Sequence, residues 1–145
     1  MKRSAIFSLS VLSLLTFAQV SYSADPRDIR RLRQTGECQR CNLVGANLRG
    51  ANLRDVNLKD ANLKNADLTG ANLQNANLHR ANLTYSSMKN AVIKDTDFSE
   101  ANLRGATIDY RELARGDAKV CNAIMPNGIK KSTDFSGFFG FGGCR

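Results

Sequence analysis

The sequence predicts an all-β solenoid, and three observations support this prediction. Residues 41–110 repeat every five positions, fourteen times, without an insertion or deletion. A large apolar residue fills the third place of every repeat, and the residue two places earlier is small and usually Ala. Asn or Asp stands between them in eleven of the fourteen repeats. Internal repetition of this kind determines the architecture before any other feature does.

A period of five fits short extended segments joined by turns. Side chains alternate along a strand, so the first and third places of a repeat point to the same side. An α-helix would spread residues five apart around its whole circumference, and no apolar face would persist. We therefore expect the third-place residues to form the interior: Leu43, Leu48, Leu53, Leu58, Leu63, Leu68, Leu73, Leu78, Leu83, Met88, Ile93, Phe98, Leu103 and Ile108.

The repeated run A-N-L-x-x resembles the pentapeptide-repeat family, whose chains wind into a right-handed quadrilateral parallel β-helix with four repeats per coil. The resemblance covers 70 of the 145 residues. It implies about three and a half coils, and a strand spacing of ~4.8 Å makes the solenoid on the order of 17 Å tall. It also implies that Asn42, Asn62, Asn82 and Asn102 stack along one side, where their amides can bond to one another.

Residues 1–23 read as an export signal. Lys2 and Arg3 precede an apolar stretch over residues 6–20, and the small residues Ser21 and Ser23 fit a cleavage site, with cleavage after Ala24 as the alternative. The stretch is short for an uncleaved membrane anchor and is diluted by Ser and Thr. We expect an exported protein without a stable membrane span, in the periplasm, a comparable lumen or the extracellular space.

Residues 24–40 are expected to cap the solenoid with a short helix over 26–34. Asp25 has the form of an N-cap, Pro26 suits the first helical position, and Gly36 is a stop signal. A solenoid needs such a cap because its open end exposes strand edges. The basic residues of this helix could contact an anionic lipid or polysaccharide, or form a solvated face: Arg27, Arg30, Arg31 and Arg33.

Four cysteines in a small exported protein indicate disulfides, for which three pairings exist. We favour Cys38–Cys41 and Cys121–Cys144, because each pair belongs to one end of the solenoid. The family resemblance implies the same pattern, with a Cys-x-x-Cys before the first repeat and a Cys pair in the tail. The alternatives are a thiol redox site, which needs a helix N-terminus, and a zinc site, which needs both pairs together.

Residues 111–145 are expected to form an irregular, disulfide-closed C-terminal cap. The five-residue pattern is lost from Asp109, and residues 109–116 could form one or two helical turns. Phe135, Phe138, Phe139 and Phe141 lie among glycines. They could plug the last coil, or Phe138 and Phe139 could belong to an exposed patch for a partner.

The charge is basic but dispersed. The chain has a formal net charge of +8, and removal of Lys2 and Arg3 with the signal leaves +6, most of it at the two ends. A nucleic-acid binder normally gathers its charge on one face, so we expect no specific nucleic-acid partner. One candidate docking wall in the repeats consists of sparse basic residues: Lys64, Lys89, Lys94 and Arg104.

These observations predict a non-enzymatic exported scaffold or protein-binding module without a cofactor or metal. No nucleophile–base pair, catalytic carboxylate pair or phosphate loop is visible in the sequence. The expected partner is another protein or an anionic envelope surface, and the oligomeric state stays open. One alternative is a Cys-x-x-Cys redox protein. Another comes from the resemblance, since some cytosolic family members mimic DNA and occupy gyrase, but that mimicry requires an acidic rod.

Overall fold

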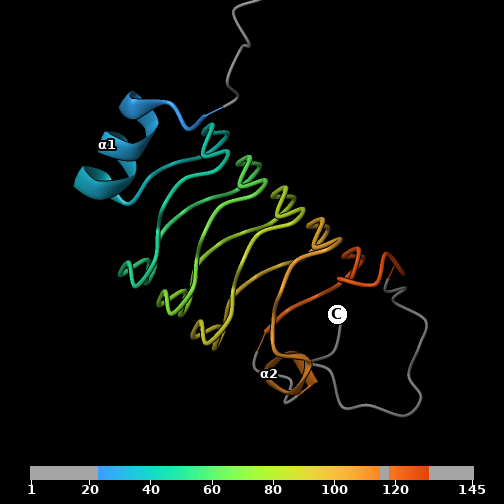
Figure 1. The fold of residues 1–145 in the computed structure, drawn as a ribbon. Coiled ribbons are helices and arrows are strands. Elements are labelled where there is room, and N and C mark those ends of the chain that lie inside the picture. The colour runs from blue at the N-terminus through green and yellow to red at the C-terminus, as the bar shows by residue number, and fades with distance from the viewer. Residues whose placement is uncertain (1–22, 115–117, 131–145) are drawn as a thin grey trace, which may run out of the picture.

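The computed structural model describes residues 23–114 and 118–130, and its two helices lie at opposite ends of a stack of coils (Figure 1). α1 spans Pro26–Thr35 and α2 spans Tyr110–Ala114. Within the described residues the coils are paired through isolated β-bridges, without a continuous strand. Each side of a coil is therefore only a few extended residues long.

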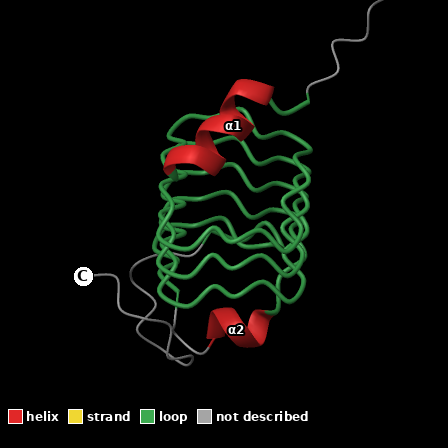
Figure 2. Ribbon diagram, turned by 90° about the vertical axis from the view of Figure 1, so that its left-hand side faces the viewer, coloured by secondary structure: helices red, strands yellow, loops and turns green. Residues whose placement is uncertain are grey.

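Successive coils are in register at a spacing of twenty residues, so one coil contains four pentapeptides. Parallel bridges join Glu37 to Asn57, and Asn57 to Asn77. Figure 2 shows the stacked coils between α1 and α2. We name the four sides walls A to D: wall A contains residues 36–40, 56–60, 76–80 and 96–100; wall B contains 41–45, 61–65, 81–85 and 101–105; wall C contains 46–50, 66–70, 86–90 and 106–110; wall D contains 51–55, 71–75 and 91–95.

Three backbone hydrogen bonds repeat on each wall between neighbouring coils. On wall A, the Leu58 N–H donates to the Asn77 carbonyl at 2.8 Å, and the Asn77 N–H donates to the Val56 carbonyl at 2.9 Å. The Asp60 N–H donates to the His79 carbonyl at 2.9 Å. An inner coil thus meets its backbone hydrogen-bonding needs through the coils above and below it, as buried backbone groups require.

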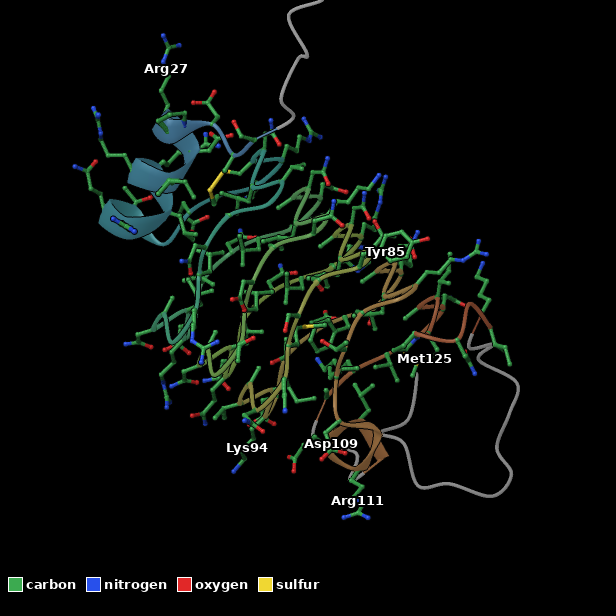
Figure 3. The ribbon with its side chains drawn as sticks, viewed as in Figure 1. Arg27, Tyr85, Lys94, Asp109, Arg111 and Met125 are labelled. Carbon is green, nitrogen blue, oxygen red and sulfur yellow. A yellow bond between two sulfur atoms is a disulfide. The ribbon has the colours of Figure 1, made fainter. Side chains whose placement is uncertain are left out.

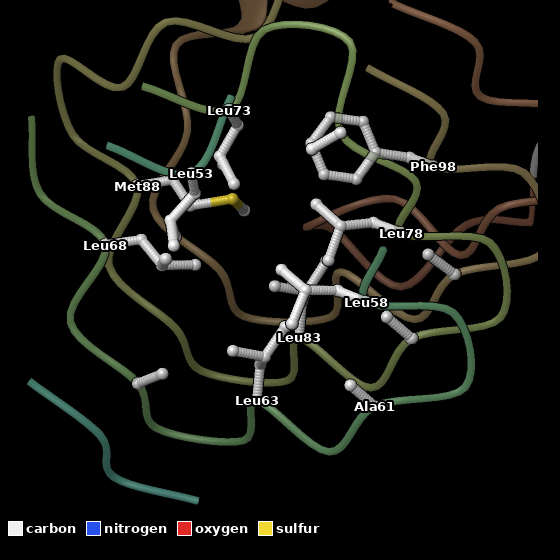
Figure 4. Close-up of a cluster of buried hydrophobic side chains, with 14 of the residues drawn as sticks. Leu53, Leu58, Ala61, Leu63, Leu68, Leu73, Leu78, Leu83, Met88 and Phe98 are labelled. Atoms are coloured by element: carbon white, nitrogen blue, oxygen red, sulfur yellow. The ribbon is translucent and has the colours of Figure 1, made fainter. Parts of the chain in front are cut away.

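The third-place residues fill the interior, as predicted. Figure 4 shows them converging on the axis of the solenoid. Several have no exposed surface: Leu43, Leu58, Leu63, Leu68, Leu73, Leu78, Leu83, Phe98 and Leu103 are all 0% exposed. Burial of one such side chain contributes roughly 1.5–3 kcal/mol. Most first-place alanines are buried beside them, and so are the larger Val56 and Thr96, which hold the same place in other repeats.

The Asn and Asp residues at the second place stabilise local turns rather than a ladder. All eleven accept a hydrogen bond at their Oδ1 from the backbone N–H two residues later, at 2.9–3.4 Å. Short side chains with an oxygen at this position commonly make such Asx bonds. Within the predicted Asn ladder, the structure has one side-chain bond, from Asn82 Nδ2 to Asn62 Oδ1 at 3.2 Å.

In the repeats from 36–40 to 101–105, the fifth residue turns the corner in the left-handed region of backbone space. The Ala46 N–H donates to the Leu43 carbonyl at 3.1 Å, and Gly45 between them has a φ of 66°. This is the pattern of a type II turn, whose third residue needs a positive φ. Gly, Asn and Asp tolerate it readily, whereas Glu100 adopts a φ of 60° at the steric cost of an ordinary side chain.

The solenoid begins earlier and ends later than predicted. Gly36–Arg40 is already a repeat, because Cys38 fills the buried third place and its N–H donates to the Asn57 carbonyl at 2.8 Å. Residues 118–122 and 123–127 are two further repeats, with Val120 and Met125 buried at the third place. The predicted boundaries at 41 and 110 are therefore wrong, and the solenoid exceeds three and a half coils.

The helix α2 explains why the pattern is lost after Asp109. The bridges Asp97–Lys119 and Asn102–Ile124 span twenty-two residues instead of twenty, so the segment that contains α2 has two extra residues. Leu113 of α2 is buried where a third-place residue belongs. The chain then reverses, and Ile124 pairs with Lys130 in an antiparallel bridge.

The corner geometry predicts opposite effects for two matched substitutions. Glu100→Gly should stabilise the protein by up to about 1 kcal/mol, because it relieves the positive φ of an ordinary residue. Gly50→Ala should destabilise the protein by about 1 kcal/mol, because Gly50 has a φ of 63°. The added Cβ would meet no atom within 4 Å, so this cost comes from the backbone conformation and not from a clash. Urea unfolding at unchanged m-value measures both. Destabilisation by Glu100→Gly would contradict this explanation of the corners.

Candidate functional site

The N-terminal end of the solenoid is closed on wall B by the start of α1. The Asp25 N–H donates to the Asn42 carbonyl at 2.9 Å, and the Asn42 N–H donates to Asp28 Oδ2 at 2.7 Å. Asp25 also caps α1 by accepting from the Arg27 N–H at 2.8 Å. Leu32 is buried and Ile29 packs against the core, so the apolar stripe of α1 covers part of the first coil as predicted.

Walls C and D remain open at this end. In the inner coils, residues equivalent to Asn47 and Asn52 use their own N–H and carbonyl to bond the neighbouring coils: the Asp67 N–H, for example, donates to the Ala46 carbonyl at 2.9 Å. Within the described part of the chain, the backbone N–H and carbonyl of Asn47 and of Asn52 have no partner. Both residues are exposed. By analogy with the inner coils, these backbone polar groups face the N-terminal end of the solenoid along two adjoining walls.

A groove of about 380 Å³ lies between α1 and this open edge. Its floor is apolar, because it is formed by the side chains of Leu48 and Leu53, each of which is 4% exposed. Two exposed arginines, Arg33 at the end of α1 and Arg49 on wall C, contribute basic side chains to its lining. Among the described residues no acidic side chain lines the groove, which is bounded by Leu32, Arg33, Asn47, Leu48, Arg49, Ala51, Asn52 and Leu53.

The Cys-x-x-Cys motif forms a structural disulfide. Cys38 and Cys41 are bonded to each other and are both 0% exposed. The bond joins the third place of one repeat to the first place of the next, so it fixes the corner between walls A and B under α1. Figure 3 shows a disulfide bond beside α1. The guanidinium Nη2 of Arg31 lies 2.7 Å from Cys41 Sγ.

The predicted basic residues do not form one surface. Arg27, Arg30 and Arg31 are exposed on α1, and Arg31 forms a salt bridge with Asp28 at 3.0 Å. In the repeats, the predicted basic wall is wrong: Lys64 and Arg104 lie on wall B, Lys89 on wall C and Lys94 on wall D. The reason is the register, because only residues separated by multiples of twenty share a wall.

The C-terminal end has a second, smaller groove of about 270 Å³ beside α2. It lies where α2 takes the place of a further wall D segment, and its lining includes Val92, which is 49% exposed. Ile93 and Ile108 line it together with Lys94, Asp109 and Glu112, so it carries charges of both signs. Cys121 is disulfide-bonded. Its predicted partner Cys144 and the predicted contacts Phe138 and Phe139 lie outside the described residues.

Asp67 on wall C has a lowered pKa. The largest cause is a hydrogen bond from the Thr69 side chain, followed by the Thr69 backbone N–H, and the positive charge of Arg49 adds to the effect. The backbone N–H lies 2.9 Å from Asp67 Oδ1. Asp67 thus favours its carboxylate form while making the same Asx bond that Asn makes in other repeats.

The described residues contain neither a metal-binding cluster nor a membrane span. No group of three or more His, Cys, Asp or Glu side chains in this part of the chain is placed to hold a metal ion. Neither helix in the described ranges is long and apolar enough to cross a membrane.

The sequence did not predict that Arg33, Arg49, Asn47 and Asn52 form a site, although Arg33 was expected on a basic helix. One signal was present: a step of twenty residues back from Asn47 or Asn52 reaches Arg27 or Leu32, inside the predicted helix. A helix cannot supply the strand that an extended edge requires. The lateral position of α1, which leaves walls C and D open, was not contained in the repeat pattern.

The repeats match a known family model. The family model described as pentapeptide repeats matches in eight copies, over residues 37–75 and 71–108. A search of curated proteins gives no match.

Three similar solved structures are pentapeptide repeat proteins. One, from the Arabidopsis thaliana thylakoid lumen, is 26% identical over 71% of this chain and 69% of its own, with a TM-score of 0.48. One from the cyanobacterium Cyanothece 51142 is 21% identical over 67% and 92%, with a TM-score of 0.49. One from the cyanobacterium Nostoc sp. strain PCC 7120, involved in heterocyst differentiation regulation, is 32% identical over 61% and 40%, with a TM-score of 0.27.

Loss of the N-terminal disulfide should weaken the first coil measurably. The two cysteines are three residues apart in sequence, and closing so short a loop is worth about 2 kcal/mol in the chain-entropy model. The Cys38→Ala/Cys41→Ala variant should therefore lose about that much in urea unfolding. Cys41→Ala alone should lose nearly as much, because either change breaks the same bond. Unchanged stability in both variants would contradict a structural role.

Asp67 should make stability fall in acid. A carboxyl whose pKa is lowered by folding stabilises the folded state above its unfolded pKa of about 4, and this contribution is lost as the pH falls through the folded pKa. Asp67→Asn keeps the Asx acceptor and should be less stable than the native protein at pH 7, with the difference shrinking towards pH 2. Thr69→Val should raise the pKa of Asp67 in an NMR titration. An unchanged titration would rule out the Thr69 hydroxyl as its main cause.

Proposed function

The chain belongs to the pentapeptide-repeat family, and from this premise we propose that it is a non-enzymatic exported scaffold or protein-binding module. One observation carries the proposal: the interior of the coils is filled by side chains, while the groove under α1 combines free backbone groups, an apolar floor and arginines. A rigid frame with a defined contact edge suits binding rather than turnover.

Export is supported by the N-terminal sequence and by the cysteines. Residues 1–23 have a basic start, an apolar stretch and small residues at the end. A buried disulfide between Cys38 and Cys41 fits an oxidising compartment such as the periplasm or a comparable lumen. We propose that residues 24–145 act there, with another protein or an anionic envelope surface as the partner.

A thiol redox function is less well supported. Redox-active Cys-x-x-Cys motifs have an accessible first cysteine at a helix N-terminus, which lowers its pKa. Here Cys38 is 0% exposed and follows α1 at its C-terminal end. Gyrase mimicry requires an acidic rod, whereas this chain carries a net charge of +8.

Intact mass spectrometry of the native protein from fractionated cells tests the proposal. The expected mass lacks the first 23 or 24 residues and four hydrogens, and alkylation without a reductant leaves it unchanged. Crosslinking in the intact envelope should then capture a discrete partner. A full-length cytosolic species with free thiols would overturn the proposed location. Reduction of insulin that depends on Cys38 and Cys41 would overturn the non-enzymatic role.

A further inference from the structure

We propose that the open edge of walls C and D binds an extended, acidic segment of a partner protein by strand addition. This inference rests on the proposed binding function and names the surface and the chemistry of the partner. Its observations are the backbone groups of Asn47 and Asn52, which bond no other described residue, the apolar floor of the groove and the two arginines in its lining.

The inner coils define how such a segment would bond. Between the first two coils on wall C, the Leu48 N–H donates to the Asp67 carbonyl at 2.8 Å, and the Gly50 N–H donates to the Thr69 carbonyl at 2.9 Å. A strand that is added before the first coil would follow the same pattern if its N–H groups donated to the carbonyls of Asn47 and Arg49. One of its carbonyls would also accept from the Asn47 N–H. Addition of an extended peptide to a free sheet edge is a common mode of recognition.

Wall B shows what satisfies such an edge in this protein. There the chain itself supplies a backbone N–H, from Asp25 to the Asn42 carbonyl, and a carboxylate, which accepts from the Asn42 N–H. Both groups come from an acidic segment immediately before and within the first turn of α1. An acidic, extended partner segment would continue this arrangement along walls C and D, where no described residue of α1 bonds the backbone of Asn47 or Asn52.

The charges around the groove favour an acidic occupant. Arg31 and Arg54 form salt bridges with Asp28 and Asp55 at 3.0 and 3.2 Å. In contrast, no salt bridge joins Arg33 or Arg49 to an acid within the described residues, although the charge of Arg49 helps to lower the pKa of Asp67. The described lining of the groove contains no Asp or Glu. A carboxylate on the bound segment could pair with either arginine while its backbone bonds the edge.

The apolar floor favours a protein segment over a polyanion. Leu48 and Leu53 lie directly beneath the groove. Strand residues alternate, so every second side chain of an added segment would face this floor while the others face the arginines or solvent. A polysaccharide or nucleic acid would gain little from an apolar floor and a few backbone groups, because its binding relies on many cationic contacts.

A binding assay with a defined peptide tests the proposal. The probe is a fluorescein-labelled dodecapeptide of alternating Glu and Val, and the protein is the processed chain isolated from its own cells or its variants. We expect saturable binding, and we expect Arg33→Glu/Arg49→Glu to weaken it by roughly tenfold or more. The matched control, Lys64→Glu/Arg104→Glu on wall B, should bind the peptide with no more than about a twofold change.

Two further probes separate strand addition from simple charge attraction. A peptide N-methylated at the residues that donate to the edge should lose binding, while one methylated at the alternate residues should keep it. Bound peptide should also slow the hydrogen exchange of the Asn47 and Asn52 amides. Equal binding of both methylated peptides, or equal loss in both double variants, would overturn the proposal.

Other occupants are distinguishable outcomes that would also overturn it. Heparin or anionic vesicles that bind and protect the same amides more strongly than the peptide would indicate a polyanion. Concentration-dependent dimers that are abolished by Arg33→Glu/Arg49→Glu would indicate a second copy. Failure of the peptide, combined with an exported protein that crosslinks to a partner elsewhere, would reject this edge while leaving the proposed function intact.

Discussion

The register between coils is the constraint on which the rest of the structure depends. Each wall must bond the wall twenty residues later, so every place in a repeat has a fixed task. The third place fills the centre, the second closes the turn through its side-chain oxygen, and the fifth adopts a positive φ. A single inserted residue would move every later side chain off its place, because strand side chains alternate. The two extra residues fall between Asp97 and Lys119, in the segment that contains α2, and the register of twenty-two continues from Lys119 to Ile124.

Because of this register, the backbone groups that could bind a partner lie at the ends of the solenoid. An inner coil has both neighbours, whereas the first coil lacks one, and its walls must be covered by other means. The first turn of α1 covers wall B through Asp25 and Asp28, and the disulfide Cys38–Cys41 fixes the adjoining corner. On walls C and D, the backbone groups of Asn47 and Asn52 have no partner in the part of the chain that the structure describes. The stacking that stabilises the inner coils therefore leaves a defined and directional contact edge at the first one.

The sequence predicted the coil, its filled interior, α1 and the N-terminal disulfide, because each has a strong local or periodic signal. The predicted start of the solenoid was too late, because the repeat 36–40 has Gly36 where most repeats have Ala and Cys38 where most have Leu. It misplaced the end because two extra residues conceal the repeat that begins at Ala118. The groove beside Arg33 and Arg49 could not be predicted, because it depends on where α1 lies across the coil. That position is decided by tertiary packing of Leu32 rather than by any pattern in the repeats.

The most direct test of the open edge is amide hydrogen exchange of the processed protein, resolved by residue with NMR. Second-place residues of the next coil, such as Asp67 and Asn72, should be strongly protected because their N–H groups bond the first coil. Asn42 should also be protected, since its N–H bonds Asp28, whereas Asn47 and Asn52 should exchange fast. Protection of Asn47 and Asn52 equal to that of Asn72 would contradict the open edge and with it the proposed site.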